Sequence, residues 1–189
     1  GGAHAAKFQS YKAETIASKN SPSYWDTTKE STKSQFQLFK KYDSFNQKDY
    51  EKLKLHCDSI GIDFLSTPFD SYSADFLNDL VPFFKIASAD LNNKLLIEQI
   101  DGFGKPMILS TGASYYYEIE RTLNWIKKSK VTLLHCVLNY PTPNENANLS
   151  RIKELKKRFN NTIGYSDHTL PSENMDVLVA SYLLGAKII

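Results

Sequence analysis

The sequence has few of the features that mark several large classes of protein. Its only two cysteines, Cys57 and Cys136, are not in CxxC spacing and lie among apolar residues, which is typical of reduced core thiols and not of a disulfide framework. The net charge is +2, and acidic and basic residues are interleaved, with no basic patch for nucleic acid. No apolar run is long enough to span a bilayer, and no signal peptide is recognisable. These absences predict a cytoplasmic globular protein with no nucleic-acid or membrane partner.

An initiating methionine is also missing. The chain opens on small residues, GGAHAA, that lead directly into an apolar segment, and it closes on GAKII, which has the pattern of a strand that is just beginning. We therefore expect residues 1–189 to be an internal piece of a longer protein.

Strands and helices alternate along the rest of the sequence. The apolar patterns predict strands at 5–9, 62–66, 83–87, 106–110, 131–136, 162–165 and from 188, and helices at 28–41, 47–60, 71–79, 115–128, 149–158 and 172–184, with one more ending at 100. Such alternation indicates parallel βαβ units, closed either as a doubly wound sheet or as a (β/α)8 barrel. The Gly-rich dinucleotide motif is absent, and polar residues follow nearly every strand, which favours the barrel. Counting the strand that begins at 188 gives seven, so we predict an incomplete TIM barrel whose first strand is absent and whose last is cut.

Lys85 lies in the middle of one apolar strand, in the segment FFKIASAD. A buried ammonium group is costly unless an anion meets it, so either an internal carboxylate or an anionic ligand must neutralise this side chain. A second lysine, Lys7, occupies another predicted strand. If both side chains face one barrel mouth, their mutual repulsion favours a bound anion such as a phosphate or carboxylate.

His168 follows a predicted strand beside Asp167, and it is the best candidate for a metal ligand or an acid–base group, with local helix capping as the alternative. One histidine cannot form a metal site by itself. His135 lies within a strand, where a core or supporting role is expected.

Seven segments, each at a predicted strand end, resemble the sialic acid synthases and their legionaminic and pseudaminic acid synthase relatives. They are KFQSYKAE, STPFD, KIASADLNN, ILSTG, LLHCVLNYPTP, GYSDHT and the terminal GAKII. The resemblance implies a (β/α)8 barrel that condenses phosphoenolpyruvate with an N-acetylated hexosamine, such as N-acetylmannosamine. It also implies release of phosphate, a nine-carbon 2-keto sugar acid as product, a divalent cation (Mn²⁺ or Mg²⁺), and a homodimer in the full-length protein.

The resemblance assigns roles to individual residues. The residues that it implies hold phosphoenolpyruvate are Lys7, Thr67, Lys85, Ser88, Ser110, Asn139 and Ser166. Tyr140 lies against the acceptor sugar by the same resemblance, His168 is one metal ligand, and these two join Lys7 and Lys85 as catalytic residues.

Three parts of the family pattern are not found in the sequence: the catalytic glutamate of the first strand, the second metal histidine after the last strand, and a C-terminal antifreeze-like domain. The resemblance therefore implies that residues 1–189 form part of the catalytic barrel and are inactive alone. Two alternatives stay open, a class I aldolase that forms a Schiff base through Lys85 and a non-catalytic phosphate- or sugar-binding barrel. The choice among sialic, legionaminic and pseudaminic acid is not determined by the sequence.

Overall fold

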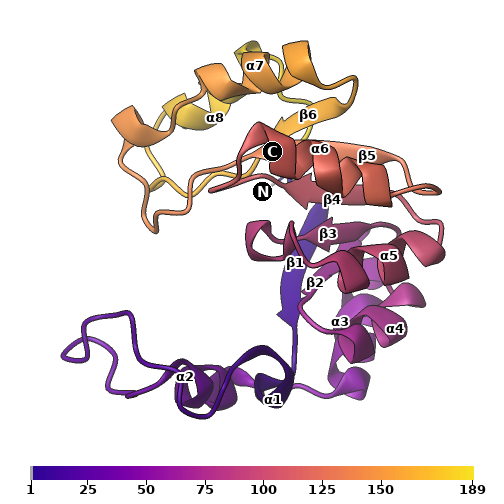
Figure 1. The fold of residues 1–189 in the computed structure, drawn as a ribbon, viewed down its shortest axis with the longest axis vertical. Coiled ribbons are helices and arrows are strands. Elements are labelled where there is room, and N and C mark those ends of the chain that lie inside the picture. The colour runs from indigo at the N-terminus through magenta and orange to yellow at the C-terminus, as the bar shows by residue number, and fades with distance from the viewer. Residues whose placement is uncertain (1) are drawn as a thin grey trace. The chain divides into compact units, whose positions relative to one another are not determined.

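The computed structural model describes residues 2–189 and has an α/β fold with parallel strands (Figure 1). The chain divides into two compact units, Gly1–Pro82 and Phe83–Ile189, and each is described by itself. No helix within residues 2–189 combines the length and the apolar character needed to cross a membrane.

Unit 1 is built on two parallel strands and four helices. These are β1 (Ala5–Ser10), α1 (Ala13–Ile16), α2 (Gln35–Tyr42), α3 (Gln47–Ser59), β2 (Asp63–Pro68) and α4 (Ser71–Asn78). The two strands pair from Ala5 with Asp63 to Ser10 with Pro68. The predicted helix at 47–60 is confirmed as α3, whose first turn is closed by a capping box from Asn46.

The predicted helix at 28–41 is wrong in its first half. Helix α2 begins only at Gln35, because Ser34 caps it and its hydroxyl accepts the Gln37 amide at 3.1 Å. Residues before this cap form turns, and Trp25 is held there by hydrogen bonds from its indole nitrogen to the carbonyls of Glu30 and Thr32. The single-turn helix α1 follows β1 directly, at residues for which the sequence pattern predicts neither a helix nor a strand.

Unit 2 is a four-stranded parallel sheet with helices between the strands. Its elements are β3 (Phe84–Ile86), the 3-10 helix η1 (Ser88–Asp90), α5 (Lys94–Gly102), β4 (Met107–Ser110), α6 (Tyr116–Trp125), β5 (Val131–His135), η2 (Asn144–Asn146), α7 (Ser150–Arg158), β6 (Thr162–Tyr165) and α8 (Asp176–Leu183). The strands lie side by side in sequence order, β3-β4-β5-β6. This arrangement confirms the parallel βαβ pattern, whereas closure into a complete barrel stays a prediction.

One face of this sheet forms the apolar core of unit 2. Ile86, Leu109, Leu133 and Ile163 pair across the four strands in register, and all are almost completely buried. Because side chains alternate between the faces of a strand, the residues on either side of this row point to the opposite face. That second face carries the candidate site.

The last residues of the chain run beside β6. The amide of Tyr165 donates to the Ile188 carbonyl and the amide of Lys187 donates to the Ile163 carbonyl, each at 2.8 Å. These bonds hold the chain end against β6, but residues 186–189 are not part of a strand, so the strand predicted from 188 stays a prediction. The helix predicted at 172–184 begins later, at Asp176, after Met175 in a left-handed conformation.

Candidate functional site

The second face of the unit 2 sheet carries a lysine and a serine that contact each other. Lys85 of β3 pairs with Ile108 of β4, so Ser110 lies on the same face two residues nearer the carboxyl end of its strand. The Lys85 ammonium group donates to Ser110 Oγ at 2.5 Å and to the Ile86 carbonyl at 3.1 Å. Ser110 is 3 % exposed and Lys85 is half-buried, so this contact is partly shielded from water.

The strand register places Cys136 and Ser166 on this same face. Leu134 pairs with Ser110 on one side and with Gly164 on the other. Cys136 follows Leu134 by two residues, and Ser166 follows Gly164 by two residues. Each strand therefore delivers a small polar side chain to the same edge of the sheet.

Ser88, in helix η1, joins these residues through its hydroxyl. Its Oγ accepts the Gly112 amide at 3.0 Å and lies 3.1 Å from the Cys136 sulfur. A Cβ atom at position 112 would lie 2.9 Å from that sulfur and 3.0 Å from Ser88 Oγ, which only glycine avoids. The turn after β4 can therefore approach Ser88 this closely because residue 112 has no side chain.

These side chains form one donor-rich surface, which we call the Lys85 face. It consists of Lys85, Ser88, Ser110, Gly112, Cys136 and Ser166. An ammonium group with several hydroxyl donors is the combination that binds phosphate or carboxylate oxygens. The Lys85 face can therefore hold a small anion at the carboxyl end of the parallel strands, the edge at which α/β proteins bind ligands.

Asp90 supplies a carboxyl group in the same short helix as Ser88. One oxygen accepts the Asn93 side-chain amide at 3.0 Å, and the other is buried without a hydrogen-bond partner among residues 2–189. Burial raises the pKa of Asp90, and the Asn93 hydrogen bond only partly opposes this shift. A buried carboxyl with a raised pKa is a candidate for proton transfer. No role was assigned to Asp90 from the sequence.

Tyr140 and His168 lie together at the loops after β5 and β6. Their ring centroids are 4.2 Å apart, and the two loops are also joined by the Thr142 amide, which donates to the His168 carbonyl at 2.7 Å. The Nδ1 atom of His168 lies 2.5 Å from the Val137 carbonyl. Since a carbonyl only accepts hydrogen bonds, Nδ1 carries the proton, and Nε2 keeps the lone pair that a metal ligand needs.

A complete metal site is not found within the described residues. No three histidine, cysteine, aspartate or glutamate side chains of residues 2–189 are grouped to hold an ion. The role of His168 as a metal ligand stays a prediction. Asn139, predicted to hold phosphoenolpyruvate, is exposed in the loop beside Tyr140, and its carbonyl accepts the Thr142 hydroxyl.

His135 lies in the core, as the sequence predicted. It is 2 % exposed, its Nε2 lies 2.8 Å from the Ala147 carbonyl, and its ring stacks on Tyr165. Burial lowers the pKa of His135, so this imidazole is kept neutral. On the neighbouring strand, burial and the hydrogen bond to Asp167 raise the pKa of Tyr165.

In unit 1, the register brings Lys7 and Thr67 to one face of the two-stranded sheet. Gln9 pairs with Thr67, and Lys7 precedes Gln9 by two residues. The Lys7 ammonium group has no hydrogen-bond or carboxylate partner within residues 2–82, and burial lowers its pKa even though much of the residue surface is exposed. The Lys7 ammonium group is therefore only partly desolvated. The meeting of Lys7 with Lys85 stays a prediction.

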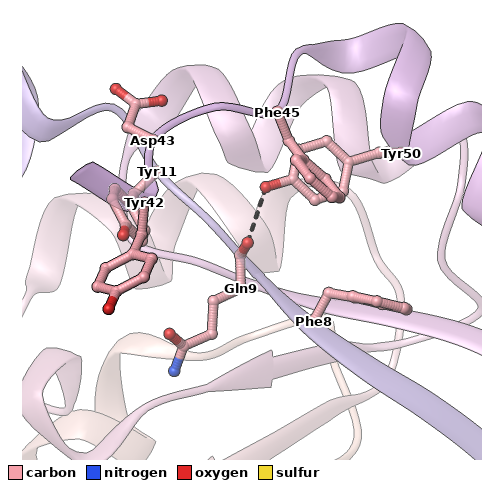
Figure 2. A pocket seen from close by; sticks show the side chains of 7 residues that line it. All are labelled: Phe8, Gln9, Tyr11, Tyr42, Asp43, Phe45 and Tyr50. Carbon is pink, nitrogen blue, oxygen red and sulfur yellow. Dashed lines mark hydrogen bonds between the residues drawn. The ribbon is translucent and has the colours of Figure 1, made fainter. Parts of the chain in front are cut away.

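A pocket lies beside the carboxyl end of β1 (Figure 2). It is lined by Phe8, Gln9, Tyr11, Tyr42, Asp43, Phe45 and Tyr50. The Tyr50 hydroxyl donates to the Gln9 carbonyl at 2.8 Å, which fixes the wall of the pocket. Asp43, its single acidic residue, is already paired with the Lys12 ammonium group at 2.8 Å. The pocket is therefore mainly aromatic, and no charged group in it lacks a partner.

The strands define a parallel α/β protein with a donor-rich surface, and comparison with known proteins makes this class more specific. The model of the NeuB family matches residues 1–189, so the chain belongs to the NeuB family. This membership agrees with the family predicted from the seven sequence segments.

Several relatives show how far the likeness extends. The chain is 43% identical to an uncharacterized protein of Methanocaldococcus jannaschii and 39% identical to the N,N'-diacetyllegionaminic acid synthase of Campylobacter jejuni, and both alignments cover all of this chain. They cover 52% and 58% of those proteins, so the chain spans about half the length of the curated relatives it matches. Among solved structures, the sialic acid synthetase of Leptospira borgpetersenii, in complex with citrate, matches with a TM-score of 0.84 and 35% identity over 99% of this chain and 61% of that one.

Proposed function

We propose that the protein to which this chain belongs condenses phosphoenolpyruvate with an N-acetylated hexosamine to form a nine-carbon 2-keto sugar acid and phosphate. The observation that carries the proposal is the Lys85 face, in which the Lys85 ammonium group and the Ser110 hydroxyl meet at 2.5 Å at the carboxyl end of parallel strands. Phosphoenolpyruvate carries a phosphate and a carboxylate, the two groups that such a surface is suited to bind. Membership of the NeuB family supports this choice of ligand.

In the proposed reaction, C3 of the enolpyruvate attacks the aldehyde carbon of the sugar, water adds at C2, and phosphate leaves. Lys85, Ser88, Ser110 and Ser166 hold the anionic groups, so that the charge on the phosphate is already stabilised when the bond to C2 breaks. On the other unit, Lys7 and Thr67 are proposed to bind the same ligand. Asn139, which is exposed in a loop, is proposed as a further contact.

Residues of the loops after β5 and β6 are proposed to bind the acceptor sugar. Tyr140 presents an exposed ring next to His168, and aromatic rings pack well against the apolar face of a sugar. We propose that a divalent cation, Mn²⁺ or Mg²⁺, binds the Nε2 atom of His168. We assign no other ligand to this ion. When bound, such an ion polarises a carbonyl oxygen. The Val137 carbonyl keeps the imidazole in the required tautomer.

N-acetylmannosamine is the proposed acceptor, which makes the product sialic acid. Legionaminic and pseudaminic acid precursors are the alternatives, since the matched relatives include a legionaminic acid synthase. The homodimer and the cytoplasmic location stay predictions for the full-length protein.

The direct test is phosphate release by the full-length protein with phosphoenolpyruvate, manganese and each candidate hexosamine in turn. We expect phosphate and a nine-carbon acid in equal amounts with one hexosamine, and no release without a sugar. Binding of phosphoenolpyruvate without turnover on any sugar would favour a non-catalytic barrel. Trapping of Lys85 by borohydride with a keto acid would favour the Schiff-base aldolase, since the proposed condensation forms no imine.

A further inference from the structure

We propose that Cys136 is a positioning residue of the anion site: its thiol proton occupies one lone pair of Ser88 Oγ, so that the Ser88 hydroxyl gives its own proton to the bound anion. The inference deepens the proposed function and rests on it. The sequence alone indicates a core thiol, because Cys136 lies in the largely apolar segment LLHCVL.

The geometry around Ser88 Oγ sets up this arrangement. A serine hydroxyl has one proton to donate and two lone pairs that accept. The Gly112 amide takes one lone pair at 3.0 Å, and the Cys136 sulfur lies 3.1 Å away, within hydrogen-bonding distance for sulfur. Two hydrogen-bond patterns satisfy these contacts. Either the hydroxyl donates to the sulfur, or the thiol donates to the hydroxyl oxygen.

The charge of the ligand selects between the two patterns. Sulfur is a weak acceptor, whereas a hydrogen bond from a hydroxyl to an ionised oxygen is about twice as strong as a neutral one. When an anion occupies the Lys85 face, the hydroxyl proton of Ser88 therefore turns to the anion, and the thiol proton of Cys136 fills the vacated lone pair. Donation from both the Gly112 amide and the thiol polarises the hydroxyl and strengthens the bond that it makes to the anion.

Ser88, Gly112 and Cys136 are closely packed against one another. A Cβ atom at position 112 would lie 2.9 Å from the Cys136 sulfur and 3.0 Å from Ser88 Oγ. Cys136 is 5 % exposed, so no bulk water competes for the lone pair that the thiol occupies. The register also puts Cys136 on the Lys85 face, because it follows Leu134, the partner of Ser110, by two residues.

The test uses the full-length protein with Cys136→Ala, Cys136→Ser and the matched control Cys57→Ala. Cys57 is also a buried free thiol, 3 % exposed in α3, and its side chain makes no hydrogen bond within the described residues. Calorimetry gives the dissociation constants of phosphoenolpyruvate and of inorganic phosphate, and steady-state kinetics gives the KM of the sugar. Thermal unfolding confirms that each variant is folded.

We expect Cys136→Ala to weaken phosphoenolpyruvate binding by about threefold to tenfold, the range for loss of one hydrogen bond. Cys136→Ser keeps a hydrogen-bond donor, so its affinity for phosphoenolpyruvate should stay within about twofold of wild type. Cys57→Ala should bind phosphoenolpyruvate as the wild type does. The KM of the sugar should be the same in all variants. A merely structural role predicts instead that alanine at 136 lowers the unfolding temperature and leaves the affinity unchanged, which would overturn the inference. Equal losses for the alanine and serine variants would overturn it as well.

The outcome for the wild-type protein separates this inference from the proposed function. If the wild type binds phosphoenolpyruvate and Cys136→Ala binds it equally well, the positioning role alone is refuted. If the wild type does not bind phosphoenolpyruvate, the proposed function fails, and the role of Cys136 in it fails too.

Discussion

Replacing Gly112 by alanine tests whether the turn after β4 shapes the anion site. The new Cβ would lie 2.9 Å from the Cys136 sulfur and 3.0 Å from both Ser88 Oγ and a methyl carbon of Leu138. Leu138 is exposed and can move aside, but the other two side chains are held within the site. The Ser88 hydroxyl must therefore turn away or the backbone must shift.

The magnitude follows from those contacts. Overpacking of a buried site typically costs about 1–3 kcal/mol, so urea unfolding of Gly112→Ala should show a loss of about that size. Displacement of the Ser88 hydroxyl also removes one charge-assisted hydrogen bond to the anion, so calorimetry should show phosphoenolpyruvate binding about tenfold weaker or worse. Both changes are measured on the full-length protein.

A matched control is Gly102→Ala at the end of α5. A Cβ atom there meets nothing within 4 Å, and the residue does not have a positive φ. Its stability should change by less than about 0.5 kcal/mol, and its affinity should not change. If Gly112→Ala matched this control in both measurements, the close packing of the Lys85 face would be refuted.

Three further predictions concern the strands and loops around the site. Gly164→Ala should lower the free energy of unfolding by about 2–3 kcal/mol, because its Cβ would lie 2.5 Å from the Ile188 carbonyl oxygen. Unchanged urea unfolding would contradict the close packing of the chain end on β6. Asp90→Asn should be more stable than wild type at pH 7 and equal to it below about pH 4. Burial raises the pKa of the Asp90 carboxyl in the folded protein. The wild type therefore loses stability as pH rises from the unfolded pKa to the folded pKa, whereas the asparagine variant does not. Urea midpoints across pH check this, and a variant less stable at pH 7 would contradict it. Tyr140→Ala should lower turnover by about threefold to tenfold and Tyr140→Phe should not, because phenylalanine keeps the ring that lies 4.2 Å from His168 and alanine removes it. Equal effects of the two variants would point to the hydroxyl instead.

Much of the fold can be predicted from the sequence, since its strands are short apolar runs with polar residues directly after them. The strand at 162–165 is found with its predicted bounds, and α3 ends one residue before its predicted end. The start of α2 was mispredicted because Phe36, Leu38 and Phe39 give the helical pattern without fixing where the helix begins, whereas the hydrogen bond of the Ser34 cap decides the boundary.

The site is predictable only in part. Lys85, Ser88 and Ser110 could be selected because polar residues at the ends of apolar strands meet at one edge of a parallel sheet. Cys136 could not, since its apolar neighbours indicate a core residue and only the pairing of Leu134 with Ser110 reveals which face it occupies. Asp90 could not be selected either, since its buried oxygen without a hydrogen-bond partner in residues 2–189 depends on packing that no local pattern encodes.

The most direct test of an anion site on the Lys85 face is calorimetric binding of phosphoenolpyruvate to the full-length wild type, Lys85→Met and Lys94→Met. Lys94 is an exposed lysine of the same unit, 3.6 Å from Glu98, and it controls for the loss of one positive charge. We expect the wild type and Lys94→Met to bind equally and Lys85→Met to bind about 10- to 100-fold more weakly, the range for a hydrogen bond to a charged group. Equal affinities of Lys85→Met and wild type would contradict the assignment of this face as the phosphoenolpyruvate site.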